Sequence, residues 1–296
     1  MELAFVVLHY NTINETLGCI KSIKDNIDTK SYKIVVVDNG SPNHSGLELK
    51  RYFAEDSYVD VILVKENIGF ARGNNIGIHY SRTNLHAEFI CCLNNDTILS
   101  QHDFFEIIKD EYLNTGAALI GPQVIRADGT VQKFSSKIMD AAVYKKLLLA
   151  LTKESRIEYL KMKIKSSKLF KYVNAIRRQA IGIEENPFIG QDNVLLHGCC
   201  LIFTPSFFQV LSGFDDRTFL YREEELLYLS IKENKLTTRY TPRLKILHLE
   251  DASTNSISTD KNKKDEFKQQ CLIESTRILI DTLESRKIMG EKPYES

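Results

Sequence analysis

The chain has 296 residues, of which 43% are hydrophobic and 26% are charged. This composition excludes a disordered or fibrous protein, and the length suffices for one sizeable core in one or two domains. The 39 Lys and Arg residues balance the 39 Asp and Glu residues, so the overall charge does not point to a nucleic-acid partner. The six cysteines form no CxxC pair and have no zinc-like spacing to histidine, which predicts reduced, buried thiols in a cytoplasmic protein.

The N-terminus predicts a core strand. Its apolar run, Leu3 to Leu8, lacks a basic flank and is too short for a signal peptide or a membrane span. No other stretch approaches the roughly 18 uncharged apolar residues that a spanning helix needs. We therefore expect any membrane contact to be peripheral.

Short β-branched runs alternate with helical patterns up to about residue 125, as in βαβ units that build a parallel sheet. The first two runs are almost continuously apolar, which is typical of strands covered on both faces. The predicted strands are Leu3–His9, Lys33–Val37, Val59–Val64 and Glu88–Leu93.

Polar residues follow three of these strands. Asn14 is a predicted cap for the helix after the first strand, and Ser100 for a helix from Gln101 to Leu113. Ligands bind at the carboxyl ends of strands in open α/β sheets, because helix N-termini and loop amides converge there. We therefore expect the functional site at three polar segments, Tyr10-Asn11, Asp38-Asn39 and Asn95-Asp96.

The pattern changes after Pro122. A hairpin is predicted around Asp128-Gly129. It is followed by a basic helical insertion over residues 138–190 and, beyond that, by elements that return to the sheet. We expect a main domain over residues 1–260 that contains this insertion, and a C-terminal helical extension over 261–296. The later predicted elements are a strand at Val194–Phe203, a helix at Glu223–Glu233, a strand ending at Lys245–His248 and a helix at Asp265–Arg286.

Residues 141–180 hold eleven Lys or Arg against two acidic residues. One interpretation is a solvated helical face, which is the usual role of a charge run. The other is a helix on an anionic membrane surface, where each basic residue contributes about 1 kcal/mol of binding. That second interpretation would make the protein peripheral at the inner membrane face.

The chain lacks a phosphate-binding P-loop, an HExxH zinc motif and a nucleophile elbow. What remains is a set of polar residues at predicted strand and helix ends. Taken alone, Asp96 is a turn residue or a metal ligand, Asp38 is part of an Asx turn or a nucleotide contact, and His248 is structural or a ligand. The three glutamates Glu223-Glu224-Glu225 either favour a first helical turn or include a general base.

The order and local sequence of these elements resemble glycosyltransferase family 2 of the GT-A fold, in particular its bacterial rhamnosyltransferase-like branch. The resemblance covers most of residues 3 to 255 outside the basic insertion. It implies an α/β fold with a Rossmann-like, mostly parallel sheet flanked by helices. The blocks that carry it are Val7–Asn11, Val36–Ser41, Asn67–Asn75, Leu93–Thr97, Gly213–Asp215, Phe219–Glu224, and His248 with Ser253.

The resemblance implies Mg²⁺ or Mn²⁺ as cofactor. Asp96 matches the last residue of the family's DXD-like motif, here Asn94-Asn95-Asp96, so an amide replaces the first carboxylate. His248 matches a histidine that joins the metal or the diphosphate. These two residues are the predicted metal ligands.

The resemblance also implies the residues that contact the donor nucleotide. Asp38 matches the position that reads the base, and Tyr10 and Asn11 lie near the base and the diphosphate. Asn95 is predicted beside them, and the loop from Asn67 to Asn75 offers amides and close backbone approach to the donor. Within that loop, the predicted donor contacts are Asn67, Gly73 and Asn74.

Glu223-Glu224 matches the family's Glu-Asp pair. Glu224 is then the base that deprotonates the acceptor hydroxyl, with Glu223 beside it, although a glutamate replaces the commoner aspartate. The implied reaction is inverting transfer of a sugar from a UDP- or dTDP-linked donor to a saccharide or lipid-linked saccharide, in bacterial surface polysaccharide synthesis. The rival interpretations are a nucleotidyltransferase and a non-catalytic sugar-nucleotide-binding or scaffold protein.

Overall fold

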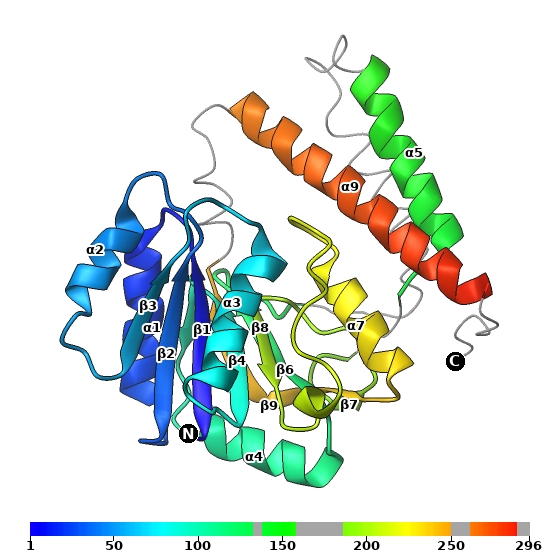
Figure 1. Cartoon of the computed structure of the whole chain (residues 1–296). Coiled ribbons are helices and arrows are strands. Elements are labelled where there is room, and N and C mark those ends of the chain that lie inside the picture. The colour runs from blue at the N-terminus through cyan, green and yellow to red at the C-terminus, as the bar shows by residue number, and fades with distance from the viewer. Residues whose placement is uncertain (133–137, 158–185, 250–260, 289–296) are drawn as a thin grey trace.

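The computed structural model describes residues 1–132, 138–157, 186–249 and 261–288. These form a central mixed sheet with helices on both faces, and a pair of long helices lies beside it (Figure 1). The predicted α/β class is confirmed. The helices are α1 (Ile13–Asn26), α2 (Ser45–Tyr52), α3 (Phe70–Thr83), α4 (Phe104–Thr115), α5 (Ala141–Ile157), α7 (Glu223–Glu233) and α9 (Lys261–Ile288), with a 3₁₀ turn at Phe207–Gln209.

The sheet order is β3-β2-β1-β4-β8-β6-β9-β5, and β7 pairs with β9. The first four strands in this order are parallel, as predicted from the βαβ pattern, and the remainder mixes parallel and antiparallel pairs. The strands are β1 (Leu3–His9), β2 (Tyr32–Asp38), β3 (Val59–Leu63), β4 (Phe89–Asn94), β5 (Thr97–Leu99), β6 (Leu119–Arg126), β7 (Gln191–Asp192), β8 (Cys200–Phe203) and β9 (Thr238–His248).

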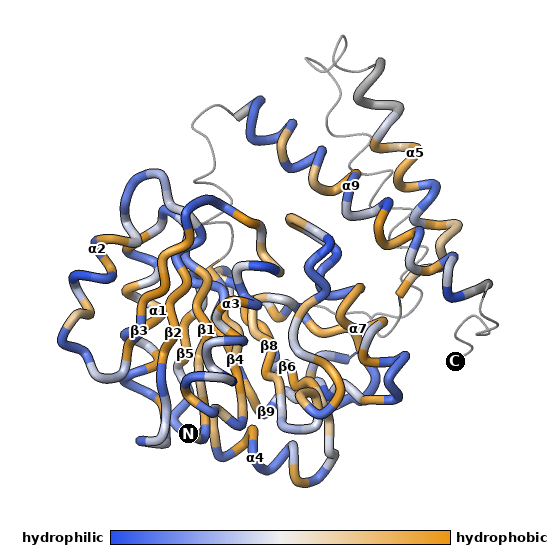
Figure 2. The backbone as a smooth tube through the Cα atoms, viewed as in Figure 1, coloured by the Kyte–Doolittle hydropathy of each residue, from blue (hydrophilic) through white to orange (hydrophobic). Residues whose placement is uncertain are grey.

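The pleat of β1 divides the core into two layers. Leu3, Phe5 and Val7 pack toward α1 and α4, whereas Ala4 and Val6 pack toward α3 and α7. Successive side chains of a strand point to opposite faces, so both faces must be apolar where helices cover both. Figure 2 shows the result: the central strands are mostly hydrophobic, whereas the outer helices alternate hydrophilic and hydrophobic residues.

The strand order reverses between β1 and β4. The chain runs from β1 outward to β2 and β3, and then returns to place β4 on the other side of β1. From its carboxyl end, β1 leads to β2 on one side, whereas β4 leads through β5 toward β9 on the other, and a crevice lies at the carboxyl ends of β1 and β4. The predicted polar segments lie at this end of the sheet.

Three local predictions are wrong. Thr12 occupies the N-cap of α1, so Asn14 lies inside the helix. Helix α4 begins at Phe104 rather than after Ser100, because the Asp28 carboxylate accepts the amide hydrogens of Phe105 and Glu106, both at 2.8 Å. The predicted strand from Val194 is shortened to β8, because the backbone turns at Gly198, whose amide hydrogen is accepted by Glu224 of α7.

A third cluster lies outside the sheet layers. Helices α5 and α9 lie side by side (Figure 1), and together they pack against α7. The first helix of the basic insertion thus buries its apolar face against the C-terminal helix. Tyr144 and Leu147 of α5 meet Leu279 and Ile280 of α9.

The predicted hairpin at Asp128-Gly129 is also present, with the Arg126 amide donating to the Thr130 carbonyl.

Candidate active site

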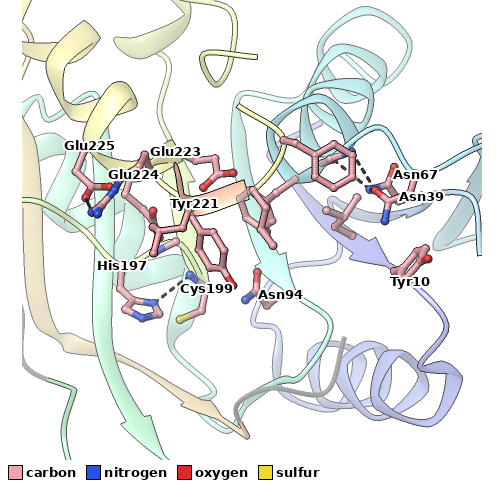
Figure 3. A pocket seen from close by; sticks show the side chains of 18 of the residues that line it. Tyr10, Asn39, Asn67, Asn94, His197, Cys199, Tyr221, Glu223, Glu224 and Glu225 are labelled. Atoms are coloured by element: carbon pink, nitrogen blue, oxygen red, sulfur yellow. Dashed lines mark hydrogen bonds and ion pairs between the residues drawn. The ribbon is translucent and has the colours of Figure 1, made fainter. Parts of the chain in front are cut away.

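A cavity of about 650 Å³ opens at the carboxyl ends of β1 and β4. Figure 3 shows the three glutamates of α7 on one side and Tyr10, Asn39 and Asn67 on the other, with Tyr221 and Asn94 between them. Most of the predicted segments therefore meet in one place. Of the predicted site residues, the cavity is lined by Tyr10, Asn67, Asn95, Asp96, Glu223, Glu224 and His248.

Asp96 and His248 meet although they are far apart in the sequence. Asp96 follows β4, and the antiparallel pairing of β5 with β9 sets Thr97 opposite His248. As a result, Nε2 of His248 lies 3.2 Å from Oδ1 of Asp96. Both side chains are largely buried, and both line the cavity. The predicted pair of metal ligands is thus adjacent.

His197 lies beside this pair, with its ring centre 5.8 Å from that of His248. Its Nδ1 accepts the amide hydrogen of Cys199 at 3.2 Å. Burial, and then the neighbouring His248, lower the pKa of His197 to about 4. A neutral imidazole therefore lines the floor of the cavity near Asp96.

Two asparagines hold the loop before α3. The Asn39 amide donates to Oδ1 of Asn67 at 3.0 Å and to the Gly69 carbonyl at 3.1 Å, and its own oxygen accepts the Ile68 amide hydrogen. Gly69 has φ +92° and lies against the backbone of Phe219, where a Cβ would come within 2.5 Å of the carbonyl oxygen. The loop is thus fixed between the end of β2 and the segment that leads to α7.

Asp38, Asn11, Gly73 and Asn74 lie behind the cavity wall. Oδ1 of Asp38 accepts the Ser41 amide and hydroxyl hydrogens, and the Ser41 hydroxyl oxygen accepts the Asn11 amide hydrogen at 2.9 Å. Burial raises the pKa of Asp38, and the bonds from Ser41 oppose this shift. These residues shape the loops near the cavity, and none of the four lines it.

Gly73 and Asn74 belong to helix α3 rather than to a loop. The Asn74 side chain donates to the Phe70 carbonyl of its own helix at 3.1 Å. A Cβ at Gly73 would lie 2.6 Å from Leu8, so the glycine lets α3 pack closely on β1. For both residues, the described contacts are structural.

The glutamates are presented by an unusual turn. Tyr221 and Arg222 have φ of 74° and 70°, a left-handed conformation that costs free energy for residues other than glycine. The turn sends Arg222 back to pair with Glu225 at 2.6 Å, with its guanidinium over the ring of Tyr144. Glu225 is thereby ion-paired, and all three glutamates line the cavity (Figure 3).

Glu224 and Glu223 have different surroundings. Oε1 of Glu224 accepts the amide hydrogen of Gly198 at 3.2 Å. Burial, and then the nearby Glu225, raise the pKa of Glu224 to about 7. Burial and the adjacent Glu224 raise the pKa of Glu223 to about 8, and its Oε1 has no hydrogen-bond partner among the described residues. Burial and mutual repulsion thus raise the proton affinity of both adjacent carboxyl groups, so that near neutral pH one of them can hold a proton while the other accepts one.

Sequence reasoning missed one whole wall of the cavity. Five side chains from α5, α9 and the segment just before α5 line it, and all are apolar. Their helical spacing was visible in the sequence, but a periodic apolar stripe does not show which surface it covers. We call this set the apolar wall: Met139, Leu147, Leu151, Phe267 and Leu272.

Solved structures with the same fold are GT-A glycosyltransferases. The S. aureus TarS fragment 1–349 matches with a TM-score of 0.50 at 11% identity, over 93% of this chain and 70% of that one. The same fragment in complex with UDP matches with a TM-score of 0.52 at 10% identity, over 90% of this chain and 69% of that one. At these identities the likeness concerns the fold.

The chain belongs to glycosyl transferase family 2, whose sequence profile matches residues 4–179. It is also 24% identical over 236 residues to the low-salt glycan biosynthesis hexosyltransferase Agl10 of Haloferax volcanii. That match covers 79% of this chain and 62% of the relative, so this chain spans less than two thirds of the relative's length.

Proposed function

We propose that this protein is an inverting glycosyltransferase that moves a sugar from a UDP- or dTDP-linked donor to a saccharide acceptor. The observation that carries the proposal is one cavity with the Asp96–His248 pair on its floor and Glu224 on its side wall. Membership of glycosyl transferase family 2 and the likeness to a hexosyltransferase of glycan biosynthesis support it.

The donor nucleotide would lie along the carboxyl ends of β1 and β2. Tyr10 offers a ring to the base, and Asn67 offers an amide to sugar or phosphate oxygens. Asp38 and Asn11 lie one layer behind, where a small movement of the 38–43 loop would bring Asp38 to the base. The UDP complex of TarS supports UDP as the first nucleotide to test.

The Asp96–His248 pair fits a divalent metal. No three His, Cys, Asp or Glu side chains of the described residues converge into a complete metal site. Two protein ligands completed by diphosphate oxygens and water are nevertheless sufficient for Mg²⁺ or Mn²⁺, which favour oxygen ligands. When bound, such a metal supplies charge neutralisation for the departing diphosphate.

Glu224 would act as the general base. Its carboxylate would take the proton of the acceptor hydroxyl as that oxygen attacks the anomeric carbon from the face opposite the diphosphate. The Gly198 amide holds one carboxylate oxygen and leaves the other for the acceptor. The protonated Glu223 would donate a hydrogen bond to a sugar hydroxyl in the same cavity.

The apolar wall favours an acceptor with a lipid part. Aliphatic side chains such as Leu147, Leu151 and Leu272 offer no hydrogen bonds to sugar hydroxyls, but they bind hydrocarbon, at about 0.8 kcal/mol for each buried CH₂ group. A lipid-linked saccharide in bacterial surface polysaccharide synthesis would contact the polar part of the cavity with its sugar and the apolar wall with its lipid. Binding of decyl phosphate but not methyl phosphate, lost in Leu272→Asn, would support this acceptor class.

We also propose that the protein is cytoplasmic and binds the inner membrane face through residues 141–180. None of the described helices is both long enough and apolar enough to cross a membrane. Lys161, Lys163, Lys165 and Lys168 lie outside the described residues, so the support here is the local charge of the sequence. Vesicles containing anionic lipid should co-sediment the wild type, and neutralising these four lysines should weaken that binding. Unchanged co-sedimentation would contradict the proposal.

Thermal shift with UDP, dTDP, GDP and CDP, each with and without Mn²⁺, tests the donor assignment. Bound ligand stabilises the folded state, so one nucleotide should raise the Tm in the presence of Mn²⁺. Asp96→Ala should abolish that rise, while Asp110→Ala, at a half-exposed carboxylate outside the cavity, should retain it. A metal-dependent rise without turnover on any acceptor would instead favour a non-catalytic sugar-nucleotide-binding protein.

A further inference from the structure

A buried chain of hydrogen bonds, mostly outside the cavity lining, links the two sides of the proposed donor site: the turn that carries Asp96 and the segment after Tyr10. From the metal side, Asn95 Nδ2 lies 2.9 Å from Thr16 Oγ1, which lies 2.7 Å from Nδ1 of His9. On the other side of the ring, Nε2 of His9 lies 2.8 Å from Ser45 Oγ. The chain then continues from Ser45 through Asn43 to the Asn11 carbonyl, with contacts of 2.7 and 2.8 Å.

Its members come from separate elements. His9 ends β1, Thr16 lies in α1, and Ser45 begins α2. Asn95 lies in the turn that carries Asp96, and Asn11 lies in the segment after Tyr10. His9, Thr16, Ser45 and Asn95 are each at most 3% exposed. We call the turn of Asn95 and Asp96 the metal turn, and the segments around Asn11 and Asn43 the nucleotide loop. His9 therefore bridges the metal turn and the nucleotide loop, although its own side chain does not line the cavity.

The contacts determine which nitrogen of His9 carries the proton. Burial lowers its pKa to about 4, so the ring is neutral and has one N–H. The Ser45 amide hydrogen also donates to Oδ1 of Asn43, which identifies that oxygen as an acceptor. The short contact between Ser45 Oγ and this oxygen needs the Ser45 hydroxyl proton, so Ser45 must accept from Nε2–H of His9.

Nδ1 of His9 is then an acceptor, and Thr16 donates its hydroxyl hydrogen to it. The opposite tautomer would leave two acceptors 2.7 Å apart at Ser45 and Asn43. When Nε2 carries the proton, the Thr16 hydroxyl donates to Nδ1 of His9, and the only hydrogen bond lost is the longer one, 3.1 Å, from this hydroxyl to the Thr12 carbonyl. Both segments of the chain, on either side of the ring, are then satisfied, and such buried networks rigidify the parts that they join.

We propose that His9, as the Nε2–H tautomer, is a positioning residue that holds the metal turn and the nucleotide loop in register for donor binding. It acts through Thr16 and Asn95 on one side, and through Ser45 and Asn43 on the other. The proposal rests on the proposed function, because it concerns the same donor site. Residues that orient a binding group from behind typically cost 10–100-fold in affinity or activity when they are replaced.

The test measures UDP affinity at saturating Mn²⁺ and the half-saturating Mn²⁺ concentration at fixed UDP, by calorimetry. His9→Leu removes both ring bonds and should weaken UDP binding by about 10-fold or more. His9→Gln keeps a side-chain N–H that can reach Ser45, and should recover part of the affinity. Ser45→Ala cuts the chain without altering β1, so it serves if the His9 variants do not fold.

Thr204→Val is the matched control. In the wild type, the hydroxyl of Thr204 is fully buried and donates to the Ala117 carbonyl at 2.8 Å, and Thr204 does not line the cavity. It should lower the Tm without changing either UDP or Mn²⁺ affinity. If His9→Leu and Ser45→Ala also lower the Tm and leave both affinities unchanged, His9 is only structural and the proposal is overturned.

A second readout does not depend on the ligand. Nitrogen-15 NMR of the histidine rings, assigned with His9→Gln, should show the His9 proton on Nε2 between pH 6 and 8. A proton on Nδ1 would overturn the direction of the chain. If the wild type binds no UDP with Mn²⁺, the donor assignment fails and with it the positioning role, while the tautomer result shows whether the chain itself is correctly described.

Discussion

The carboxyl group of Glu224 must lose its proton before it can serve as a base. Because burial and Glu225 raise its pKa to about 7, kcat/KM should rise as the pH passes through about 7 and level off above it. Glu224→Gln should lower kcat by roughly 10²–10⁴-fold while UDP still raises the Tm. A pH–rate profile for wild type and variant, from pH 5.5 to 9, measures both. A flat profile would exclude Glu224 as the base.

Glu223 has a consequence for stability. Its pKa of about 8 in the folded state lies above the ordinary glutamate value of 4.5, so at intermediate pH the unfolded chain binds fewer protons. Stability therefore falls as the pH rises from about 4.5 through 8. Glu223→Gln removes this dependence and should raise the Tm more at pH 9 than at pH 5. The exposed Glu266→Gln should change the Tm equally at both pH values; equal shifts for Glu223→Gln would contradict the assignment.

At the scale of elements, the site depends on how closely the loop before β8 approaches α7. A Cβ at Gly198 would lie 2.4 Å from Oε1 of Glu224. Gly198→Ala should therefore displace the carboxylate and lower kcat at least tenfold, with little change in UDP affinity. In Gly18→Ala the added methyl group would be 4.0 Å from its nearest neighbour, Ile98, so activity should be retained. Steady-state kinetics of both variants tests this prediction, which an unchanged kcat in Gly198→Ala would contradict.

The element predictions succeeded where the signal is local. β1 is a continuous apolar run, and its observed bounds are those predicted from the sequence. The start of α4 was missed because its cap, Asp28, lies far away in the sequence and its contact exists only in the folded chain. The left-handed turn at Tyr221 and Arg222 was also not predictable, since neither residue type favours it and its stabilisation comes from Tyr144 and Glu225.

At the scale of the whole molecule, α5 and α9 are held by a small apolar cluster with α7. Leu279 is fully buried in this cluster, next to Tyr144 and Leu226. Leu279→Ala should cost about 2–5 kcal/mol of unfolding free energy, while Leu113→Ala, at a site 80% exposed, should cost less than about 0.5 kcal/mol. Denaturant unfolding checks both. If the two losses are equal, the cluster contributes no stability.

The candidate site was predictable to the extent that it sits on the sheet. The family resemblance predicts Asp96 and His248 as metal ligands, and the structure brings the two side chains together. For Asn39 the sequence predicts only a position at the end of a strand, because its hydrogen bonds to Asn67 and Gly69 exist only in the folded chain. The apolar wall required knowledge of how α5 and α9 dock, which depends on long-range packing rather than on any local pattern.

The pairing of β5 with β9 has a consequence during synthesis on the ribosome. Asp96 leaves the exit tunnel long before His248. In the described part of the sheet, β9 is the only strand that pairs with β5. Chains fold from the N-terminus as they emerge, so the nascent protein forms the strands before β5 first and lacks His248, the second proposed metal ligand. Stalled chains that end before β9 should therefore fold their parallel strands but bind no Mn²⁺-dependent nucleotide. The site becomes competent only when nearly the whole described chain has been made.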